Sequence, residues 1–240
     1  MGDAMEKLKI YLTYSAALIC VFLFGGLLYL SVGEEPDAVT AAAAPQKTVV
    51  IDAGHGGEDS GAVANGLSEK DINLSIAKQL KEYLEISGYT VIMTRTEDKA
   101  IYDSSAGTVR EKKVSDMEKR RDIINSDENN ILISIHQNKF EQPKYSGAQM
   151  FYSGNDPASE RLAQCIKNSV TSLLQPENRR ECKKDEGSIY ILKTARVPAV
   201  IVECGFLSNP EEAKKLSDEG YRRKMAFAVC CGFLDYMKTA

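Results

Sequence analysis

The chain has 240 residues, of which 43% are hydrophobic and 27% charged, and its formal net charge is −4 at pH 7. This near-balance of charge provides no basic stripe of the kind that nucleic-acid binding needs, so we expect no nucleic-acid partner. The six cysteines show no CxxC spacing and predict no regular disulfide framework, although Cys165 and Cys182 could pair in an oxidising compartment. Cys204, Cys230 and Cys231 lie in apolar contexts and are expected to be small core residues.

Residues 10–32 form an almost uncharged, apolar run that is long enough to cross a bilayer. Two lysines precede the run and acidic residues follow it, which predicts a short cytoplasmic N-terminus over residues 1–9 and an exported body. The length of the run favours a retained membrane anchor over a cleaved signal peptide, although the small residues 41–44 could accept a signal peptidase. Residues 33–46 are predicted to be a linker to a single domain at 47–240, which is then exported in anchored or secreted form.

The predicted domain opens on a short β-branched run at 49–51, which is typical of a buried strand and leads into a glycine-rich turn that carries His55. A helix follows over about 68–87, because apolar residues recur there at a helical period, and Gly88 ends it. A second strand at 89–93 completes a βαβ unit.

The polar stretch 96–114 has no clear period and predicts a long loop, which is followed by a helix over 115–125 and a strand at 131–135. The remaining predicted elements are a strand at 148–152, a helix at 157–174, a charged excursion at 175–185, strands near 188–192 and 199–203, and helices at 211–216 and 221–237. This alternation of strands and helices predicts an α/β fold with a mixed, largely parallel sheet.

The chain contains only two histidines, His55 and His136, and each follows an apolar strand. Because sites in open α/β sheets form at the carboxyl ends of the strands, we expect the two imidazoles to lie together. Two imidazoles and one carboxylate, with a fourth position open, are the ligands of a catalytic zinc ion. The carboxylate candidates near His55 are Asp52, Glu58, Asp59 and Glu69. Glu69 has a fixed place at the helix start, where it could instead act as a cap, and Asp52 could orient a histidine rather than bind the metal.

Glu203 ends the apolar strand at 199–203. A charge in such a place is rarely there for stability, because desolvation costs on the order of several kcal/mol unless the charge is paired. At the same sheet edge as the histidines, it could act as a general base toward a metal-bound water. The alternative is an internal ion pair with Arg95 or Arg196.

Five sequence blocks occur in order: 51–57 (IDAGHGG), 69–74 (EKDINL), 94–95 (TR), 134–138 (SIHQN) and 202–209 (VECGFLSN). Together, across about residues 47–237, they resemble the zinc-dependent N-acetylmuramoyl-L-alanine amidases of the Amidase_3 family. The resemblance implies a three-layer α/β/α sandwich and hydrolysis of the amide that joins N-acetylmuramic acid to L-alanine in peptidoglycan. It also implies that His55, Glu69 and His136 bind Zn²⁺ and that Glu203 is the catalytic carboxylate. Cys204 stands where many relatives carry an apolar residue, and we expect it to point into the core.

Within the family, the apolar N-terminal segment, the lone catalytic domain and the run 110–116 resemble the spore-cortex amidases. This finer resemblance implies a role in the formation of muramic-δ-lactam, which germination needs, at the forespore or spore-cortex side of the membrane. Three alternatives remain open: a zinc peptidase acting on the stem peptide, a non-catalytic cell-wall-binding protein, and an amidase whose protein activator docks on 96–114 or 175–185. Asn138 and Asn209 could contact glycan or peptide, or could hydrogen-bond to loop backbone.

Overall fold

The structure is a computed structural model that describes Met5 and residues 47–238. The predicted anchor or signal segment at 10–32 and the linker at 33–46 lie outside these residues. Of the helices within the described part of the chain, none is long and apolar enough to cross a membrane.

A six-stranded mixed sheet forms the centre of the domain. Its order is β4 (Thr90–Met93), β1 (Thr48–Ala53), β5 (Asn130–Asn138), β8 (Ala199–Phe206), β6 (Gln149–Tyr152) and β7 (Lys183–Lys184). The first four strands run parallel, β6 runs antiparallel to β8, and β7 pairs parallel with β6. The predicted α/β fold with a mixed, largely parallel sheet is therefore confirmed. The parallel strands bring the ends of β1, β5 and β8 to one edge.

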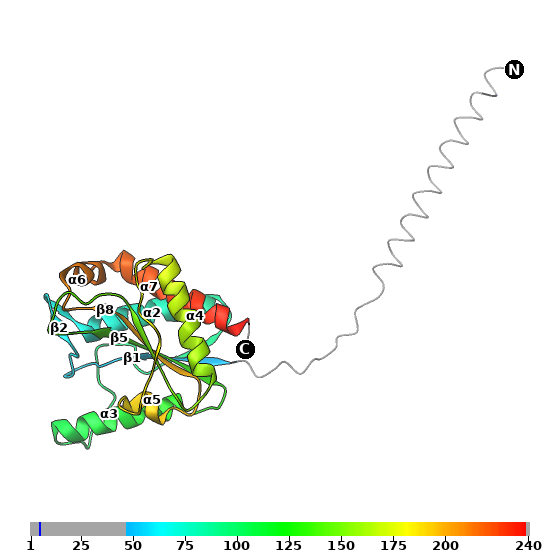
Figure 1. The fold of residues 1–240 in the computed structure, drawn as a ribbon. Helices are drawn as coiled ribbons and strands as arrows, with labels where there is room; N and C mark the ends of the chain where they lie inside the picture. The colour runs from blue at the N-terminus through cyan, green and yellow to red at the C-terminus, as the bar shows by residue number, and fades with distance from the viewer. Residues whose placement is uncertain (1–4, 6–46, 239–240) are drawn as a thin grey trace. The chain divides into compact units, whose positions relative to one another are not determined.

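Helices cover both faces of the sheet (Figure 1). On one face lie α2 (Glu69–Ile86), α4 (Ala158–Leu173), α6 (Pro210–Ser217) and α7 (Glu219–Met237), and on the other lie α3 (Val109–Ile124) and α5 (Tyr190–Thr194). Side chains of a strand alternate between the two faces, so Val49 and Ile51 of β1 pack in the first core and Val50 packs in the second. Both cores are buried, which explains the continuous apolar strands.

Helix α3 begins at Val109, six residues before the predicted start, so the prediction of a loop over 96–114 was wrong beyond Thr108. The Thr108 hydroxyl accepts from the Glu111 backbone N–H, and the Glu111 carboxylate accepts from the Thr108 backbone N–H. This capping box starts the helix although the segment has almost no apolar face. The sequence signal was therefore in the cap rather than in the periodicity.

The predicted strand near 188–192 was also wrong, because this segment forms the short helix α5. A short apolar run does not distinguish a buried strand from a buried helical turn. The carboxylate of Asp185 accepts from the backbone N–H groups of Ser188 and Ile189, and this turn leads into the helix. Two short pairings were not predicted: the hairpin of β2 (Val63–Ala64) with β3 (Leu67–Ser68), and β7 at the sheet edge.

Candidate metal site and catalytic carboxylate

His55 lies in the turn after β1 and has a left-handed backbone, with φ of 62°. This conformation is uncommon for a residue other than glycine, and it costs on the order of 1–3 kcal/mol. It reverses the chain directly after the strand, and Gly56 and Gly57, which also have positive φ, continue the turn. The imidazole is thereby directed toward the start of α2.

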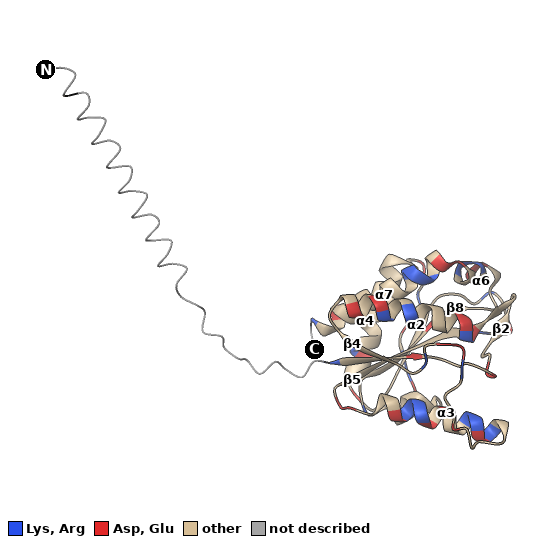
Figure 2. Ribbon diagram, turned by 180° about the vertical axis from the view of Figure 1, so that it is seen from behind, with Lys and Arg blue, Asp and Glu red and all other residues tan. Residues whose placement is uncertain are grey.

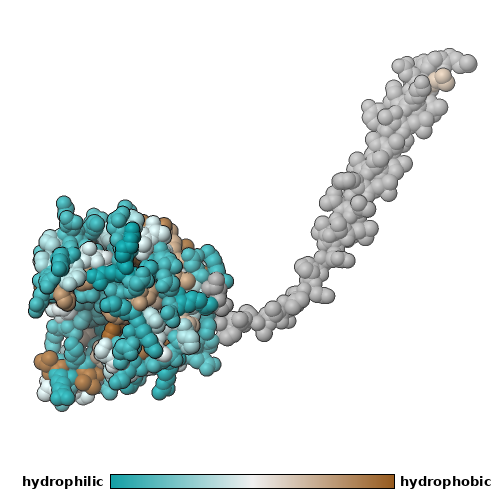
Figure 3. All heavy atoms as spheres, in the orientation of Figure 1, coloured by the Kyte–Doolittle hydropathy of each residue, from teal (hydrophilic) through white to brown (hydrophobic). Residues whose placement is uncertain are grey.

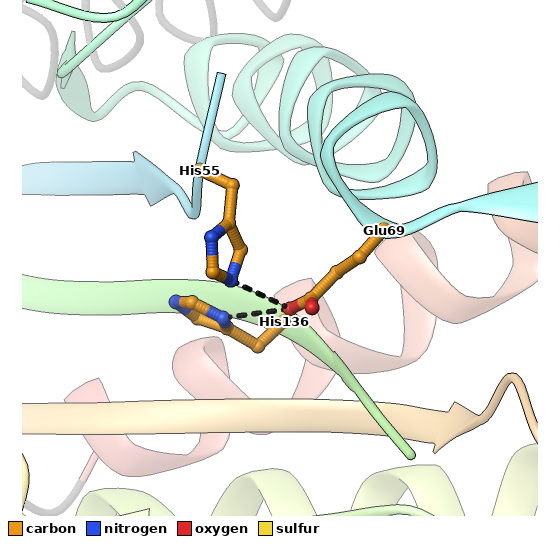
Figure 4. Close-up of side chains that lie close together, drawn as sticks. All are labelled: His55, Glu69 and His136. Carbon is orange, nitrogen blue, oxygen red and sulfur yellow. Dashed lines mark hydrogen bonds and ion pairs between the residues drawn. The ribbon is translucent and has the colours of Figure 1, made fainter. Parts of the chain in front are cut away.

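The three residues proposed from the sequence as metal ligands converge on one point (Figure 4). His55 Nε2 lies 3.3 Å and His136 Nδ1 lies 2.9 Å from the same oxygen, Oε1 of Glu69. The candidate ligand atoms of the three residues all lie within 4.8 Å of one another. A turn after β1, the first residue of α2 and the end of β5 thus supply two nitrogens and one oxygen, a set that suits zinc.

Backbone groups hold the carboxylate of Glu69 in place. Its Oε2 accepts from Ala62 N–H at 2.7 Å, and its Oε1 accepts from Gln137 N–H at 3.1 Å. The helix N-terminus favours the negative charge. The side chain is 5% exposed and also accepts from the Asn73 side chain of α2 at 3.4 Å, and none of its described contacts is with a backbone N–H of its own helix. The carboxylate is therefore preorganised between the two imidazoles.

Glycines make room for these side chains. A Cβ atom on Gly54 would overlap the imidazole of His136. A Cβ atom on Gly61 would lie 2.5 Å from Oε2 of Glu69 and 2.7 Å from Cδ2 of His55. Both positions therefore require the absence of a side chain, so that the ligand-bearing segments can approach closely.

The charges of the site are strongly coupled. Burial alone would lower the pKa of His55, but its hydrogen bonds and attraction to Glu69 and Asp59 raise that pKa to about 9. Burial alone would raise the pKa of Glu69, but its contacts with His136 and His55 hold that pKa well below its ordinary value. A buried anionic oxygen that draws positive charge toward it is what a bound cation needs, so the residues present fit a zinc ion.

The other carboxylates near His55 have different roles. Oδ2 of Asp59 lies 3.0 Å from His55 Nδ1, so Asp59 contacts the ring on the side away from Glu69. Glu58 pairs with Lys112. Asp52 is fully buried and bonds to Arg120, Thr94 and Ser134 rather than to a histidine. The contact between Asp59 and the His55 ring had one signal in the sequence, which is that Asp59 follows His55 by four residues in a tight turn.

Glu203 lies opposite His136 in the β5–β8 register. Its Oε2 is buried without a hydrogen-bond partner among the described atoms, and burial raises the pKa of Glu203 to about 7. The alternative ion pair with Arg95 is not formed, since the Arg95 guanidinium donates to backbone carbonyls, and Glu203 has no ion pair within the described residues. A carboxyl group that titrates near neutrality can both accept and return a proton.

A cavity of about 510 Å³ opens over these groups. Among the groups that line it are His55, His136 and Glu203, together with apolar side chains of α3, α5 and β8 such as Met117 and Ile191. The space-filling view shows a hollow beside the corner that α3 occupies (Figure 3). The cavity combines reactive groups with an apolar wall, as ligand sites commonly do.

Three further expectations concern residues around the site. Asn209 caps α6 and donates to the carbonyls of Pro143 and Tyr145, so its role is structural. Cys204 is fully buried in the core, as expected. Cys165 and Cys182 are both free thiols in the structure.

The family model described as N-acetylmuramoyl-L-alanine amidase (Amidase_3) matches residues 49–234. The chain belongs to this family. The germination-specific N-acetylmuramoyl-L-alanine amidase of Bacillus subtilis is 37% identical over 190 residues, which are 79% of each protein. The solved CwlD amidase of Clostridioides difficile, in complex with the GerS lipoprotein, is 42% identical with a TM-score of 0.78, and the match covers 81% of this chain and all of that one.

A more distant solved relative, AmiC2 of Nostoc punctiforme, is 29% identical with a TM-score of 0.69, over 80% of this chain and 97% of that one. The family resemblance inferred from the five sequence blocks is confirmed. The protein is therefore a hydrolase with N-acetylmuramoyl-L-alanine amidase activity on peptidoglycan.

Proposed function

We propose that this amidase is zinc-dependent, that His55, Glu69 and His136 bind the ion, and that Glu203 is its catalytic residue. The observation that carries the proposal is the convergence of two imidazole nitrogens on one carboxylate oxygen, with Glu203 opposite His136 in the adjacent strand. Zinc, when bound, supplies a Lewis acid that polarises the scissile carbonyl and lowers the pKa of water toward ~7.

The chain's own residues carry the proton transfers. Glu203 takes the proton of the attacking water and later delivers it to the leaving amine of L-alanine, so that the amide C–N bond breaks and the lactyl carboxylate is released. Burial keeps the Glu203 carboxyl close to the pKa that both transfers require.

The proposed site of action is the spore cortex, where removal of the stem peptide precedes the formation of muramic-δ-lactam. The names of two relatives, a germination-specific amidase and CwlD, support this role. We propose that residues 1–9 are cytoplasmic and that residues 10–32 are a membrane anchor or signal segment. The linker at 33–46 then leads to the domain at 47–240 on the exported side of the membrane.

A protein activator is part of the proposal, because the related CwlD was solved in complex with the GerS lipoprotein. The surface that we propose for it is the segment 96–114, which includes the start of α3. Val109 is 80% exposed and Val114 is 50% exposed. Apolar side chains at this corner of the molecule are visible in Figure 3. Exposed apolar side chains in a segment otherwise rich in charge are typical of an interaction surface.

The test combines zinc content with product analysis on the full chain in detergent, using peptidoglycan as substrate. About one zinc per chain and release of stem peptides with a free L-alanine amine would support the proposal. Cleavage within the stem would instead identify a peptidase. If the protein binds zinc but does not release peptides, the assay is repeated with a lipoprotein of the GerS kind, and turnover should then appear. A protein that binds no zinc even after the metal is added back would overturn the proposed site.

The cortex role has its own test. The gene is introduced into a Bacillus subtilis strain that lacks its germination-specific amidase, and muramic-δ-lactam is measured in the spore cortex. Restored lactam would support the role, whereas wall hydrolysis by the purified protein without lactam in these spores would place the amidase elsewhere.

A further inference from the structure

Helix α3 is held to the domain by few apolar contacts. It is densely charged (Figure 2), and its buried residues are Arg120 and Ile124. Several of its polar contacts reach the turn that carries His55. Lys112 pairs with Glu58 at 3.0 Å, and Lys113 lies 3.7 Å from Asp59. Because Glu58 is 66% and Lys113 69% exposed, these two surface pairs contribute little to the placement of the helix, and its buried polar contact with the turn is made by Arg120.

Arg120 makes the deepest of these contacts. Its guanidinium is 1% exposed and donates to Asp52 Oδ1 at 2.6 Å, to the Ala53 carbonyl at 2.9 Å and to the His55 carbonyl at 2.8 Å. Arg95 binds the carbonyls of Ala53 and Gly54, so among these two buried arginines Arg120 is the one that reaches His55 itself. The left-handed backbone of His55 is thus held through its own carbonyl.

Asp59 holds the imidazole ring of His55, as Arg120 holds its backbone. Its Oδ2 lies 3.0 Å from His55 Nδ1, while Nε2 of the same ring faces Glu69. The Gly61 N–H donates to Asp59 Oδ1 at 3.1 Å, and the backbones of Gly56 and Asp59 hydrogen-bond to each other. The carboxylate is therefore fixed within the turn. A hydrogen bond to one imidazole nitrogen determines which nitrogen remains free to bind metal.

We infer that Arg120 and Asp59 are positioning residues of the metal site. This inference rests on the zinc site proposed above. Arg120 fixes the strained backbone of His55, and Asp59 fixes the orientation and tautomer of its ring, so that Nε2 is presented to the ion. Neither residue binds the ion itself. Because Arg120 belongs to α3, the placement of that helix determines how well His55 is preorganised as a ligand.

Asp59 gives the decisive test, because its side chain is 44% exposed and its loss leaves the core intact. Zinc affinity of the full chain is measured by competition with a chelator for the wild type, Asp59→Ala and Asp59→Asn. We expect Asp59→Ala to weaken zinc binding about 10- to 100-fold. Asp59→Asn should lose less, because its amide oxygen can still accept from Nδ1–H.

Glu58→Gln is the matched control. It removes a negative charge from the neighbouring position, but its carboxylate pairs with Lys112 rather than with His55. Zinc affinity of this variant should stay within about twofold of the wild type. Equal losses in Glu58→Gln and Asp59→Ala would mean that only charge matters, and would overturn the inference.

A second readout reports the ring directly. The chain has two histidines, so ¹⁵N NMR of labelled protein shows four imidazole nitrogens. In the zinc-loaded wild type, His55 should show a protonated Nδ1 and a metal-bound Nε2, and Asp59→Ala should change the Nδ1 signal. Unchanged affinity and unchanged His55 signals in Asp59→Ala would overturn the inference. Absence of zinc from the wild type would overturn the proposed site itself, which is a distinguishable result.

Arg120→Lys tests the backbone contact. Lysine keeps the charge opposite Asp52, but one ammonium group cannot reproduce the planar fork that reaches four acceptors, the fourth being Asp116 Oδ2. We expect zinc affinity to fall about 10-fold or more, with Lys119→Ala, a variant of the same helix that pairs with Asp103, near the wild-type value. A folded Arg120→Lys protein with wild-type zinc affinity would remove Arg120 from the inference.

Discussion

His136 and Glu203 lie directly opposite each other in the parallel pair of β5 and β8. They are 67 positions apart in the sequence, yet the register puts a candidate metal ligand beside the candidate proton carrier on the same face of the sheet. The separation of the two roles onto adjacent strands means that each can be removed alone. Substitution at the two positions should therefore have different consequences.

Glu203→Gln is predicted to abolish hydrolysis while zinc stays bound. The amide keeps the size of the side chain but can neither take nor return a proton, so the rate should fall about 10²- to 10⁴-fold. Zinc per chain and the rate of release of stem peptides are measured on the same sample. Turnover of Glu203→Gln at the wild-type rate would rule out the role proposed for this carboxylate.

His136→Ala is predicted to lose both zinc and hydrolysis. The substitution removes one of three ligands and leaves Glu69 with one imidazole contact. The expected result is a zinc content far below one per chain at zinc concentrations that saturate the wild type. Full zinc occupancy in His136→Ala would show that the ion binds elsewhere.

The proximity of the two histidines could be predicted from local sequence features, whereas Glu69 was one of four candidate carboxylates until the family resemblance selected it. His55 and His136 follow apolar strands, and Glu69 begins a periodic helix. Since parallel strands end at one edge, the topology alone brings these positions together. Periodicity and strand order therefore predicted most of the fold and brought the histidines to one sheet edge, and the binding of zinc by His55, Glu69 and His136 stays a proposal.

The positioning residues could not be predicted in this way. Arg120 lies in the middle of a helix with no apolar stripe, and its partners at 52–55 are known only once α3 is packed on the turn. Asp59 looks like an ordinary turn residue until the left-handed backbone of His55 brings the ring against it. Such contacts depend on tertiary geometry rather than on local pattern, as does the helical state of α5.

Gly54→Ala is predicted to disrupt the site through steric overlap. The added methyl group would overlap the imidazole of His136, which must then move. A displacement of about 1 Å in such a site can cost ~100-fold in rate, so we expect at least this loss of hydrolysis together with weaker zinc binding. Zinc affinity and peptide release are measured in parallel.

Gly107→Ala provides the comparison for this glycine substitution. A Cβ atom there would lie 3.6 Å from Oε2 of Glu111, which is an ordinary contact. Its zinc affinity should equal that of the wild type. If Gly54→Ala also binds zinc like the wild type, the tight packing between Gly54 and His136 is not a requirement of the site.

Zinc affinity is predicted to rise with pH. The pKa of His55 in the metal-free site is about 9, so below this pH the ring carries a proton that zinc must displace. The apparent affinity should therefore increase up to about tenfold per pH unit between pH 6 and 8. Chelator competition at three pH values measures the slope, and calorimetry in two buffers of different ionisation enthalpy counts the proton released. A pH-independent affinity would contradict the contact of His55 with Glu69 and Asp59 in the metal-free protein.

Asp52 is predicted to make the fold sensitive to acid. Burial alone would raise its pKa, but attraction to Arg120 and hydrogen bonds from Ser134 and Thr94 lower it from 3.8 to about 2. A carboxyl group whose pKa is lower in the folded state stabilises the fold above pH 3.8, and this contribution, about 2–3 kcal/mol, is lost as the pH falls toward 2. Urea unfolding of the wild type at pH 7, 4 and 3 measures the loss.

Asp52→Asn separates this ion pair from the general effect of acid. The variant leaves the buried guanidinium of Arg120 without its deepest charge partner, so it should be about 3–5 kcal/mol less stable at pH 7. It should also lose less stability than the wild type between pH 4 and 3, because it has no carboxyl group to protonate at this position. Asp122→Asn, whose side chain is 65% exposed on the same helix, should change the free energy of unfolding by no more than about 0.5 kcal/mol. Equal acid sensitivity of Asp52→Asn and the wild type would show that this pair does not set the low-pH stability, since any remaining loss would then come from other carboxylates.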